Sequence, residues 1–249
     1  MKTLLIIPTY NERSNLPALI PRLSAIDTLE LLFIDDHSSD GTAEWIRELM
    51  LKQSNVHLIE RPGKLGLGTA YIAGFQWALA RPYDLIFEMD ADLSHDPAEI
   101  PNFIRKMEEG FDLVIGSRYL DGIRIINWPL RRLILSRFAA SYTRLWTGLP
   151  LTDPTSGFKC FRRCVLEALN LNRIRSNGYA FQIEVDYYTW KSGFRLAEIP
   201  ITFTDRHQGS SKMDRKIVYE AVWMVPRLRF EWLFKKTAEY FSIRKSRGP

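Results

Sequence analysis

Cysteine and long apolar segments are scarce in this sequence. The 249 residues include 2 cysteines, Cys160 and Cys164, which are too few for a disulfide framework and lack the further ligands of a zinc site. No window offers the ~18 apolar residues that a membrane-spanning helix requires. The apolar run at residues 3–7 starts too early to follow a secretory signal peptide. We therefore expect reduced cysteines in a cytoplasmic protein that does not cross a bilayer.

Common phosphate-binding and catalytic motifs are also missing. Residues 64–69 contain two glycines, but they have neither the Gly-Lys-Ser/Thr of a P-loop nor the third glycine of a dinucleotide fingerprint. These glycines are better suited to open a helix, whose N–H groups can face an anion. The 4 histidines occur singly, so no hydrolase triad is indicated and we interpret each as structural. The sequence therefore predicts neither an ATPase nor a dehydrogenase.

Acidic residues are scarce in two parts of the chain. Residues 206–249 contain 11 Lys and Arg against 4 Asp and Glu, and residues 118–147 contain 6 against 1, although the whole chain carries a net charge of only +5. The basic residues alternate with Leu, Ile and Trp at helical spacing, and no helix-turn-helix, zinc-finger or RNA-recognition signature accompanies them. These features argue against nucleic acid as a partner and favour an anionic membrane surface.

Short apolar runs alternate with amphipathic segments in the first half of the chain. Runs that predict strands occupy residues 3–7, 30–34, 56–59, 84–89 and 112–115, and segments that predict helices occupy residues 14–25, 42–52, 69–80 and 97–109. This alternation is typical of a mostly parallel sheet with helices on both faces. We therefore predict an α/β fold with a nucleotide-binding half at about residues 1–118, and a further strand at residues 200–204.

Two later segments have helical periodicity and large aromatic side chains. In the first, residues 131–146, apolar side chains that include Leu135 and Phe138 recur on one face while Arg137 and Arg144 take another. The second, residues 216–236, ends in two lysines. Both patterns fit helices that lie on a membrane surface, and both also fit surface helices that pack on the core. The aromatic side chains that could anchor them are Trp146, Trp223, Phe230, Trp232 and Phe234.

Asp90 and Asp92 form the most informative pair of residues. They stand two residues apart directly after an apolar run, and the segment that follows begins a helix, so both carboxylates should lie in a strand-to-helix turn. Ligand sites of open α/β sheets lie at such turns, beyond the carboxyl ends of the strands. Hard oxygen ligands suit Mg²⁺ or Mn²⁺, and these ions complete their coordination shell with phosphate oxygens of the substrate. The same pair also fits ordinary turn and cap chemistry.

Polar side chains follow the first two predicted strands as well. Tyr10 and Glu12 come after the first strand and Asp36 after the second, so they should lie at the same sheet edge as Asp90 and Asp92. An aromatic ring can stack on a base, and a carboxylate can hydrogen-bond a base or a ribose hydroxyl. Asp40 and Gly41, in the segment that follows Asp36, are interpreted differently, as a turn and a helix cap.

Three cations are expected near this edge. Arg118 ends the fifth predicted strand, and Arg206 and Lys212 stand in a loop of small residues that follows the strand predicted at residues 200–204. Cations that gather near a diphosphate can neutralise a leaving group. A single such cation would more simply be a solvated surface charge.

Taken in order, these motifs resemble the dolichyl- and polyprenyl-phosphate mannosyltransferases, which belong to the family 2 glycosyltransferases. The resemblance extends to about residue 216, and seven motifs carry it. They are Pro8-Thr9-Tyr10-Asn11-Glu12, Ile34-Asp35-Asp36, Leu65-Gly66-Leu67-Gly68-Thr69-Ala70-Tyr71, Asp90-Ala91-Asp92-Leu93-Ser94-His95, Gly116-Ser117-Arg118-Tyr119, Ser156-Gly157-Phe158 and Asp205-Arg206 with Lys212.

The resemblance implies a GT-A type nucleotide-diphospho-sugar transferase fold, GDP-mannose as donor, a polyprenyl or dolichyl monophosphate as acceptor, and Mg²⁺ or Mn²⁺ on Asp90 and Asp92. It implies that the guanosine is held by Pro8, Tyr10, Glu12, Ile34 and Asp36, and the ribose, metal and sugar phosphate by Asp90, Ala91 and Asp92. Phosphates would be contacted by Arg118, Arg206 and Lys212, and the acceptor phosphate by Arg118, Arg132 and Ser136. Some relatives place a metal-binding Gln where Ser94 stands, and the shorter Ser94 is not expected to reach the metal.

The same resemblance implies a catalytic domain at residues 1–215, with an acceptor half at about residues 119–215, and a C-terminal amphipathic basic segment at residues 216–249. The protein would associate peripherally with the cytoplasmic face of a membrane, and a membrane-spanning partner subunit is a further candidate partner. Two other functions stay open at this point. The scaffold could use UDP-glucose or another sugar nucleotide, or the chain could be a non-catalytic membrane-associated subunit.

Overall fold

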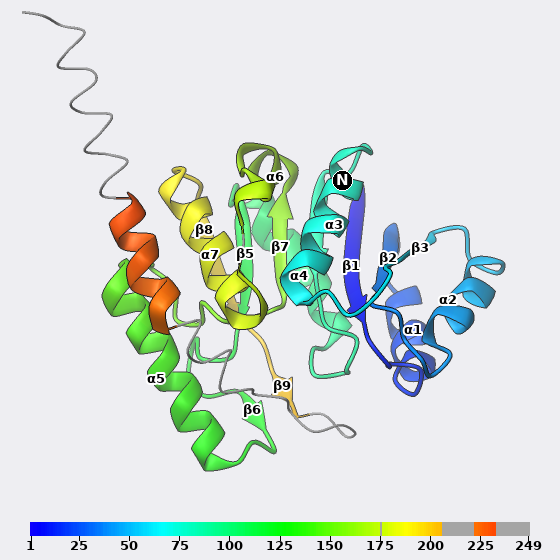
Figure 1. Ribbon diagram of the computed structural model, residues 1–249, viewed down its shortest axis with the longest axis horizontal. Coiled ribbons are helices and arrows are strands. Elements are labelled where there is room, and N and C mark those ends of the chain that lie inside the picture. The colour runs from blue at the N-terminus through cyan, green and yellow to red at the C-terminus, as the bar shows by residue number, and fades with distance from the viewer. Residues whose placement is uncertain (175, 206–221, 233–249) are drawn as a thin grey trace, which may run out of the picture.

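The apolar runs form a central sheet of seven strands, shown in Figure 1 for the computed structural model, which describes residues 1–174, 176–205 and 222–232. The strand order is β3-β2-β1-β4-β7-β5-β8, and β7 is the only antiparallel member among these seven. The strands are β1 Thr3–Thr9, β2 Leu29–Asp35, β3 Val56–Glu60, β4 Leu85–Glu88, β5 Leu113–Ser117, β7 Lys159–Arg162 and β8 Leu196–Pro200. Two short strands, β6 Ile125–Ile126 and β9 Phe203–Thr204, pair separately.

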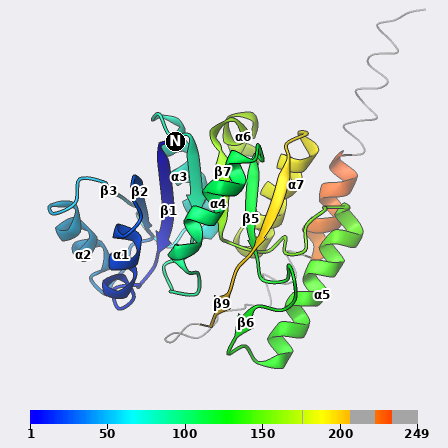
Figure 2. The ribbon, with the colours of Figure 1, turned by 180° about the vertical axis from the view of Figure 1, so that it is seen from behind.

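Helices cover both faces of this sheet because its strands are apolar on both sides. In β1, Leu4 and Ile6 belong to the core cluster that includes residues of α3, α6 and α7, while Leu5 and Ile7 belong to the cluster that includes residues of α1, α2 and α4. The two sets of helices lie on opposite faces of the sheet (Figures 1 and 2). The helices are α1 Leu16–Ser24, α2 Thr42–Met50, α3 Leu67–Leu79, α4 Ile100–Glu108, α5 Leu130–Thr147, α6 Arg163–Ala168 and α7 Gly178–Lys191, with 3₁₀ turns at Pro97–Glu99 and Leu171–Arg173. The predicted mostly parallel α/β fold is therefore confirmed.

The predicted elements before residue 118 are confirmed, with bounds that differ by a few residues. The strand predicted at residues 200–204 is wrong, because β8 ends at Pro200 and only Phe203 and Thr204 return to a strand, in the separate pair with β6. Pro200 has no N–H to donate, so a ladder ends at it readily. The two cysteines are free, as predicted: Cys160 is buried and Cys164 is exposed.

The helix predicted at residues 131–146 forms as α5, but its core-facing side is not the apolar stripe. The buried residues of α5 are Ala140, Thr143 and Thr147, whereas Phe138 and Leu145 are 66% and 79% exposed. Residues 222–232 form a helix beside α5 at one end of the molecule, as both ribbon views show. Within the described residues, no helix is long and apolar enough to span a membrane.

The parallel order brings several loops to one edge of the sheet. β1, β2, β4 and β5 all run in the same direction, so the residues after each strand meet at their carboxyl ends. This edge also lies next to the β6–β9 pair and the start of α5 (Figure 1). The fold therefore collects the predicted donor-side and acceptor-side residues in one region.

Candidate active site

Asp90 and Asp92 follow β4 in a tight turn, as predicted. Asp92 is buried, and its Oδ1 accepts hydrogen bonds from the backbone N–H of Ser94 at 3.0 Å and from the Ser94 hydroxyl at 2.5 Å. Leu93, which lies between Asp92 and Ser94, has a φ of +63°, a left-handed backbone conformation that residues with branched side chains seldom adopt. Ser94 therefore fixes the Asp92 carboxylate, and the turn keeps a strained backbone of the kind that concentrates at functional sites.

The donor set of this turn fits a divalent cation that also binds substrate. The described residues contain no group of three or more His, Cys, Asp or Glu side chains that would enclose a metal. Asp90 is half-buried and Asp92 stands two residues away, so the turn places two carboxylates at the edge of the sheet. Mg²⁺ and Mn²⁺ are commonly held by one or two carboxylates together with substrate phosphates. The site suits such an ion rather than a fully protein-bound one.

Tyr10 offers an exposed ring for a base to stack on. It is 38% exposed, and the Lys64 Nζ lies 4.0 Å from the centre of its ring. The side-chain oxygen of the next residue, Asn11, accepts from the backbone N–H of Ser39, and the backbone N–H of Asn11 donates to the Ser38 hydroxyl oxygen. Pro8 and Ile34, also predicted to touch the nucleoside, are opposite each other on β1 and β2. These residues lie together on the carboxyl side of β1 and β2.

The turn before α2 has the cap chemistry expected of it. Asp40 accepts hydrogen bonds from the backbone N–H groups of Arg13 and Thr42 and from the Thr42 hydroxyl. Gly41 is the N-cap of α2 with a φ of +86°, a left-handed conformation that suits glycine. The backbone N–H of Glu12 donates to the Thr42 hydroxyl at 3.0 Å, which ties the end of β1 to the same turn. The interpretation of Asp40 and Gly41 as a turn and a helix cap is confirmed.

Asp36 is held by protein groups that the sequence did not reveal. It is buried, and its Oδ1 forms a short ion pair with Arg61. Its Oδ2 accepts from the backbone N–H groups of Leu65 and Gly66 at 3.2 and 3.4 Å. Arg61 also donates to the Gly66 carbonyl at 3.0 Å and to the Thr69 hydroxyl at 2.7 Å. Arg61 directly follows β3, so the edge rule that selected Asp36 could also have found it.

The glycines of residues 64–69 open a helix, as predicted. Gly66 is the N-cap of α3 with a φ of +101°. At Gly68 the backbone of another segment approaches closely, since a Cβ there would lie 2.5 Å from the Ser176 carbonyl oxygen. The anion that the N–H groups of this turn meet is the protein's own Asp36 carboxylate. The segment is thus tied to the residue that follows β2, at the same edge of the sheet.

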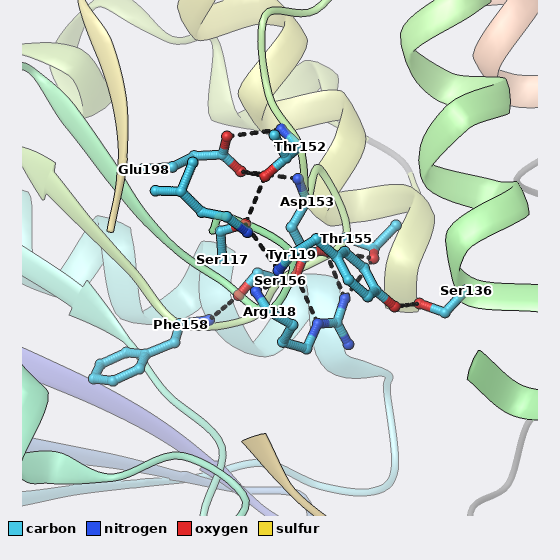
Figure 3. A network of polar contacts seen from close by, with 11 residues as sticks. Ser117, Arg118, Tyr119, Ser136, Thr152, Asp153, Thr155, Ser156, Phe158 and Glu198 are labelled. Carbon is cyan, nitrogen blue, oxygen red and sulfur yellow. Dashed lines mark hydrogen bonds and ion pairs between the residues drawn. The ribbon is translucent and has the colours of Figure 1, made fainter. Parts of the chain in front are cut away.

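Arg118 follows β5 and is fixed by a carboxylate, as Figure 3 shows. Its Nε and Nη2 each donate to Asp153 at 2.6 Å, and Nη2 also donates to the Thr155 hydroxyl at 2.8 Å. Burial alone would raise the pKa of Asp153, but the charge of Arg118 and hydrogen bonds from it hold that pKa below its usual value. Arg118 is therefore a firmly oriented, permanently charged group.

Arg118, Arg132 and Ser136 lie around one cavity, as the acceptor-phosphate prediction requires. Arg132 Nη1 donates to Asp205 at 2.7 Å, and the Tyr119 hydroxyl donates to Ser136 at 2.6 Å. The cavity measures about 340 Å³ and lies between α5, α7 and the helix at residues 222–232. Apart from Arg118, Arg132 and Ser136, its lining is mostly apolar and includes Leu135, Phe138, Ala139, Tyr142, Ile183, Val222 and Val225.

A cluster of charged side chains is buried beneath the Asp90 turn. Lys159 Nζ donates to Asp186 at 2.6 Å, and Lys159 stands opposite Glu88 in the antiparallel register of β7 and β4. All three side chains are fully buried. Burial raises the pKa of Glu88 to about 8 and that of Asp186 to about 7, although the positive charge of Lys159 opposes both shifts. Burial also raises the pKa of Tyr71, and the neighbouring Asp90, Glu88 and Asp92 raise it further.

The change Lys159→Met is expected to lower the free energy of unfolding by about 3–5 kcal/mol near pH 8, because it leaves buried carboxylates without a cation. The loss should be smaller near pH 5. A carboxyl whose pKa is raised in the folded state binds more protons there than in the unfolded chain, so its effect on stability becomes less favourable as pH rises. Urea unfolding at both pH values measures this, with the exposed Lys52→Met as control. An equal loss at both pH values would contradict the buried-charge account.

Two predicted cations fall outside the described residues. Arg206 and Lys212, expected on the donor phosphates, belong to residues 206–221, and Lys235, Lys236 and Phe234 belong to residues 233–249. Their predicted roles stay predictions. The described part of the site thus contains the two carboxylates, the nucleoside-side residues and the three residues assigned to the acceptor phosphate.

Comparison with known proteins defines the class. Residues 4–169 match the model of glycosyl transferase family 2, so the chain belongs to the family 2 glycosyltransferases. It is 45% identical over 226 residues to a polyprenol monophosphomannose synthase of Mycolicibacterium smegmatis, covering 90% of this chain and 85% of that protein. It is 44% identical over 228 residues to an undecaprenyl-phosphate mannosyltransferase of Micrococcus luteus, covering 91% of this chain and 93% of that protein. The resemblance noted in the sequence is confirmed.

Solved structures share the fold at lower identity. A glucosyl-3-phosphoglycerate synthase from Mycobacterium tuberculosis, solved with Mn²⁺, UDP-glucose and phosphoglyceric acid, has a TM-score of 0.66 and 19% identity, covering 92% of this chain and 79% of that one. This likeness supports the GT-A type fold. The enzyme class of the present chain, a glycosyltransferase, rests on the family match and on the two relatives.

Proposed function

We propose that this glycosyltransferase transfers mannose from GDP-mannose to a polyprenyl monophosphate of the dolichyl type, giving polyprenyl β-mannosyl phosphate and GDP. The observation that carries the proposal is the cavity beside α5. Arg118 and Arg132 both lie over the Trp128 ring in its wall, Arg118 donates to the Thr155 hydroxyl, and most of the other lining side chains are apolar. An acceptor with a phosphate head and an isoprenoid tail has the matching division of charge and apolar surface. The names of the two relatives support the same acceptor class.

The acceptor phosphate can act as nucleophile without a strong general base, because a phosphate monoester is already ionised near neutral pH. Arg118, Arg132 and Ser136 would hold it and turn one oxygen toward C1 of the mannose. The new bond forms between that oxygen and C1 while the bond from C1 to the diphosphate oxygen breaks, and the electron pair leaves with GDP. A single displacement of this kind inverts an α-linked donor to a β-linked product.

On the donor side, Tyr10 would stack on the guanine. Glu12 and Asp36 would accept hydrogen bonds from the base or from the ribose hydroxyls. Asp90 and Asp92 would hold Mg²⁺ or Mn²⁺, with Ser94 keeping Asp92 in place. A divalent cation at this turn supplies charge neutralisation for the departing diphosphate. Arg206 and Lys212 are proposed to add positive charge at the same phosphates.

A donor panel with purified protein tests this proposal against its nearest alternative. We expect transfer to polyprenyl phosphate from GDP-mannose, with little or none from UDP-glucose or UDP-mannose. Efficient transfer from a uridine nucleotide would contradict GDP-mannose as the donor but would still support polyprenyl phosphate as the acceptor. No transfer from any sugar nucleotide would instead favour a non-catalytic subunit.

We also propose that the chain binds the membrane surface through α5 and residues 222–232. Leu145 and Trp223 are 79% and 78% exposed, which a stripe packed on the core would not allow. Exposed Arg137 and Arg144 on α5 and Arg229 on the neighbouring helix supply positive charge at the same end of the molecule. Apolar side chains next to basic ones are the combination that binds anionic lipid. The cavity for the acceptor lies between these two helices, where an isoprenoid tail would enter from the bilayer.

The double change Leu145→Glu with Trp223→Glu is expected to weaken binding to anionic vesicles at least about tenfold, because it replaces two apolar anchors with negative charge. Co-sedimentation at low and high salt measures the effect, and wild-type binding should fall as salt rises. Leu51→Glu is the matched control, since Leu51 is 89% exposed but follows α2 at the opposite end of the molecule. Unchanged binding by the double variant would contradict the membrane assignment.

A further inference from the structure

Arg118 reaches the acceptor cavity in one fixed orientation. Asp153 occupies the edge of the guanidinium formed by Nε and Nη2, and Thr155 takes the second hydrogen of Nη2. The backbone N–H of Arg118 also donates to Asp153, at 3.0 Å. Among the described residues no acceptor engages Nη1, and Arg118 lines the cavity. The protein thus leaves one nitrogen of this guanidinium, with two hydrogens, for an anion.

A second carboxylate holds the loop that carries Asp153. Glu198 lies on β8, next to β5 in the sheet. Its Oε1 accepts from the backbone N–H of Asp153 at 2.8 Å and from the Thr152 hydroxyl at 2.9 Å, and its Oε2 accepts from the backbone N–H of Thr152 at 2.7 Å. Thr152 in turn bonds the Ser117 hydroxyl at 2.7 Å, directly before Arg118 (Figure 3).

We propose that Asp153 and Glu198 are positioning residues for the transfer reaction, acting in sequence on Arg118: Glu198 fixes the loop, Asp153 fixes the guanidinium, and Nη1 meets the acceptor phosphate. This role rests on the proposed function. Neither carboxylate lines the cavity, and Asp153 is fully buried, so neither touches substrate in this arrangement. Both would repel a phosphate if they did.

The physical reason for such a relay is the flexibility of arginine. A free arginine side chain samples many rotamers and loses that freedom when it binds an anion. A guanidinium that is already fixed by a fork of two hydrogen bonds loses little more. Small misplacements of a group that orients the reacting atoms cost large factors in rate. The two carboxylates would therefore act on the acceptor step and leave donor binding unchanged.

The change Glu198→Gln tests the relay, because it preserves shape but replaces one accepting oxygen with an NH₂ group that cannot accept from Thr152 or Asp153. We expect kcat/KM for polyprenyl phosphate to fall about tenfold, with KM for GDP-mannose unchanged. Glu167→Gln is the matched control, since Glu167 pairs with Arg163 on the exposed side of α6.

The same change in an Arg118→Lys background separates positioning from general support of the fold. Lysine keeps the charge but cannot form the fork to Asp153. If Glu198 acts through Arg118, Glu198→Gln should cause almost no further loss in that background. Equal tenfold losses in both backgrounds, or no loss in the wild type, would overturn the positioning role alone. A wild-type chain that transfers nothing to any polyprenyl phosphate would overturn the proposed function and this role with it.

Discussion

Alanine in place of Asp92 is expected to lower the rate of mannosyl transfer about a thousandfold or more. The carboxylate follows β4 at the edge of the sheet where the donor is proposed to bind, and the backbone N–H and hydroxyl of Ser94 both donate to its Oδ1. If the Asp92 carboxylate binds the cation that neutralises the diphosphate, loss of this carboxylate removes several kcal/mol of transition-state stabilisation. Initial rates with saturating GDP-mannose and Mg²⁺ or Mn²⁺ measure the effect.

Two controls accompany this experiment. Asp96→Ala removes another carboxylate a few residues along, whose Oδ1 accepts from the Ala98 N–H as a helix cap, so it should cost about 1 kcal/mol of stability and little activity. Excess EDTA should abolish turnover by the wild type. Undiminished turnover in EDTA, or an Asp92→Ala enzyme within tenfold of wild type, would rule out the metal assignment.

The second large effect is expected at Arg118. Changing Arg118 to Met should lower kcat/KM for polyprenyl phosphate at least about a hundredfold, because it removes the charge and the orienting donor for the attacking phosphate. The single change also leaves Asp153 buried without its partner, which should cost about 3–5 kcal/mol of stability. Loss of activity alone would therefore be ambiguous.

The double change Arg118→Met with Asp153→Leu resolves this ambiguity. It removes both members of the buried pair and should restore much of the stability, since replacing a buried ion pair with apolar side chains is often neutral. Activity should stay at the low level of the single variant. Thermal unfolding and transfer assays on the three proteins give the comparison, and recovery of activity in the double variant would show that Arg118 serves only the fold.

The sequence predicted the first five strands and their helices because each strand is a short apolar run followed by a turn. It did not predict β7, which carries Lys159 and Arg162 in four residues and so does not look like a buried strand. Lys159 is buried only because Asp186, 27 positions further along, meets it. A pairing over that distance leaves no local pattern in the chain.

The same reason explains which site residues were found. Asp36, Asp90, Asp92 and Arg118 each stand directly after a parallel strand, where position alone indicates a ligand site. Asp153 is in a loop with no such marker, and its importance comes from Arg118, 35 positions away. The apolar stripe of α5 had two interpretations, because periodicity shows which side chains share a face but not what covers that face. Exposure of Phe138 and Leu145 decided between core packing and an open surface.

We propose that this one polypeptide joins mannose to a polyprenyl phosphate. The most direct test of this proposal is incubation of the purified chain with GDP-mannose labelled in the sugar, a polyprenyl phosphate and Mg²⁺ or Mn²⁺, followed by isolation of the lipid product and determination of its anomeric configuration by NMR. We expect one mannose per lipid phosphate, in β linkage, with one GDP released for each. An α-linked product, or label that stays in the aqueous phase while GDP accumulates, would contradict it.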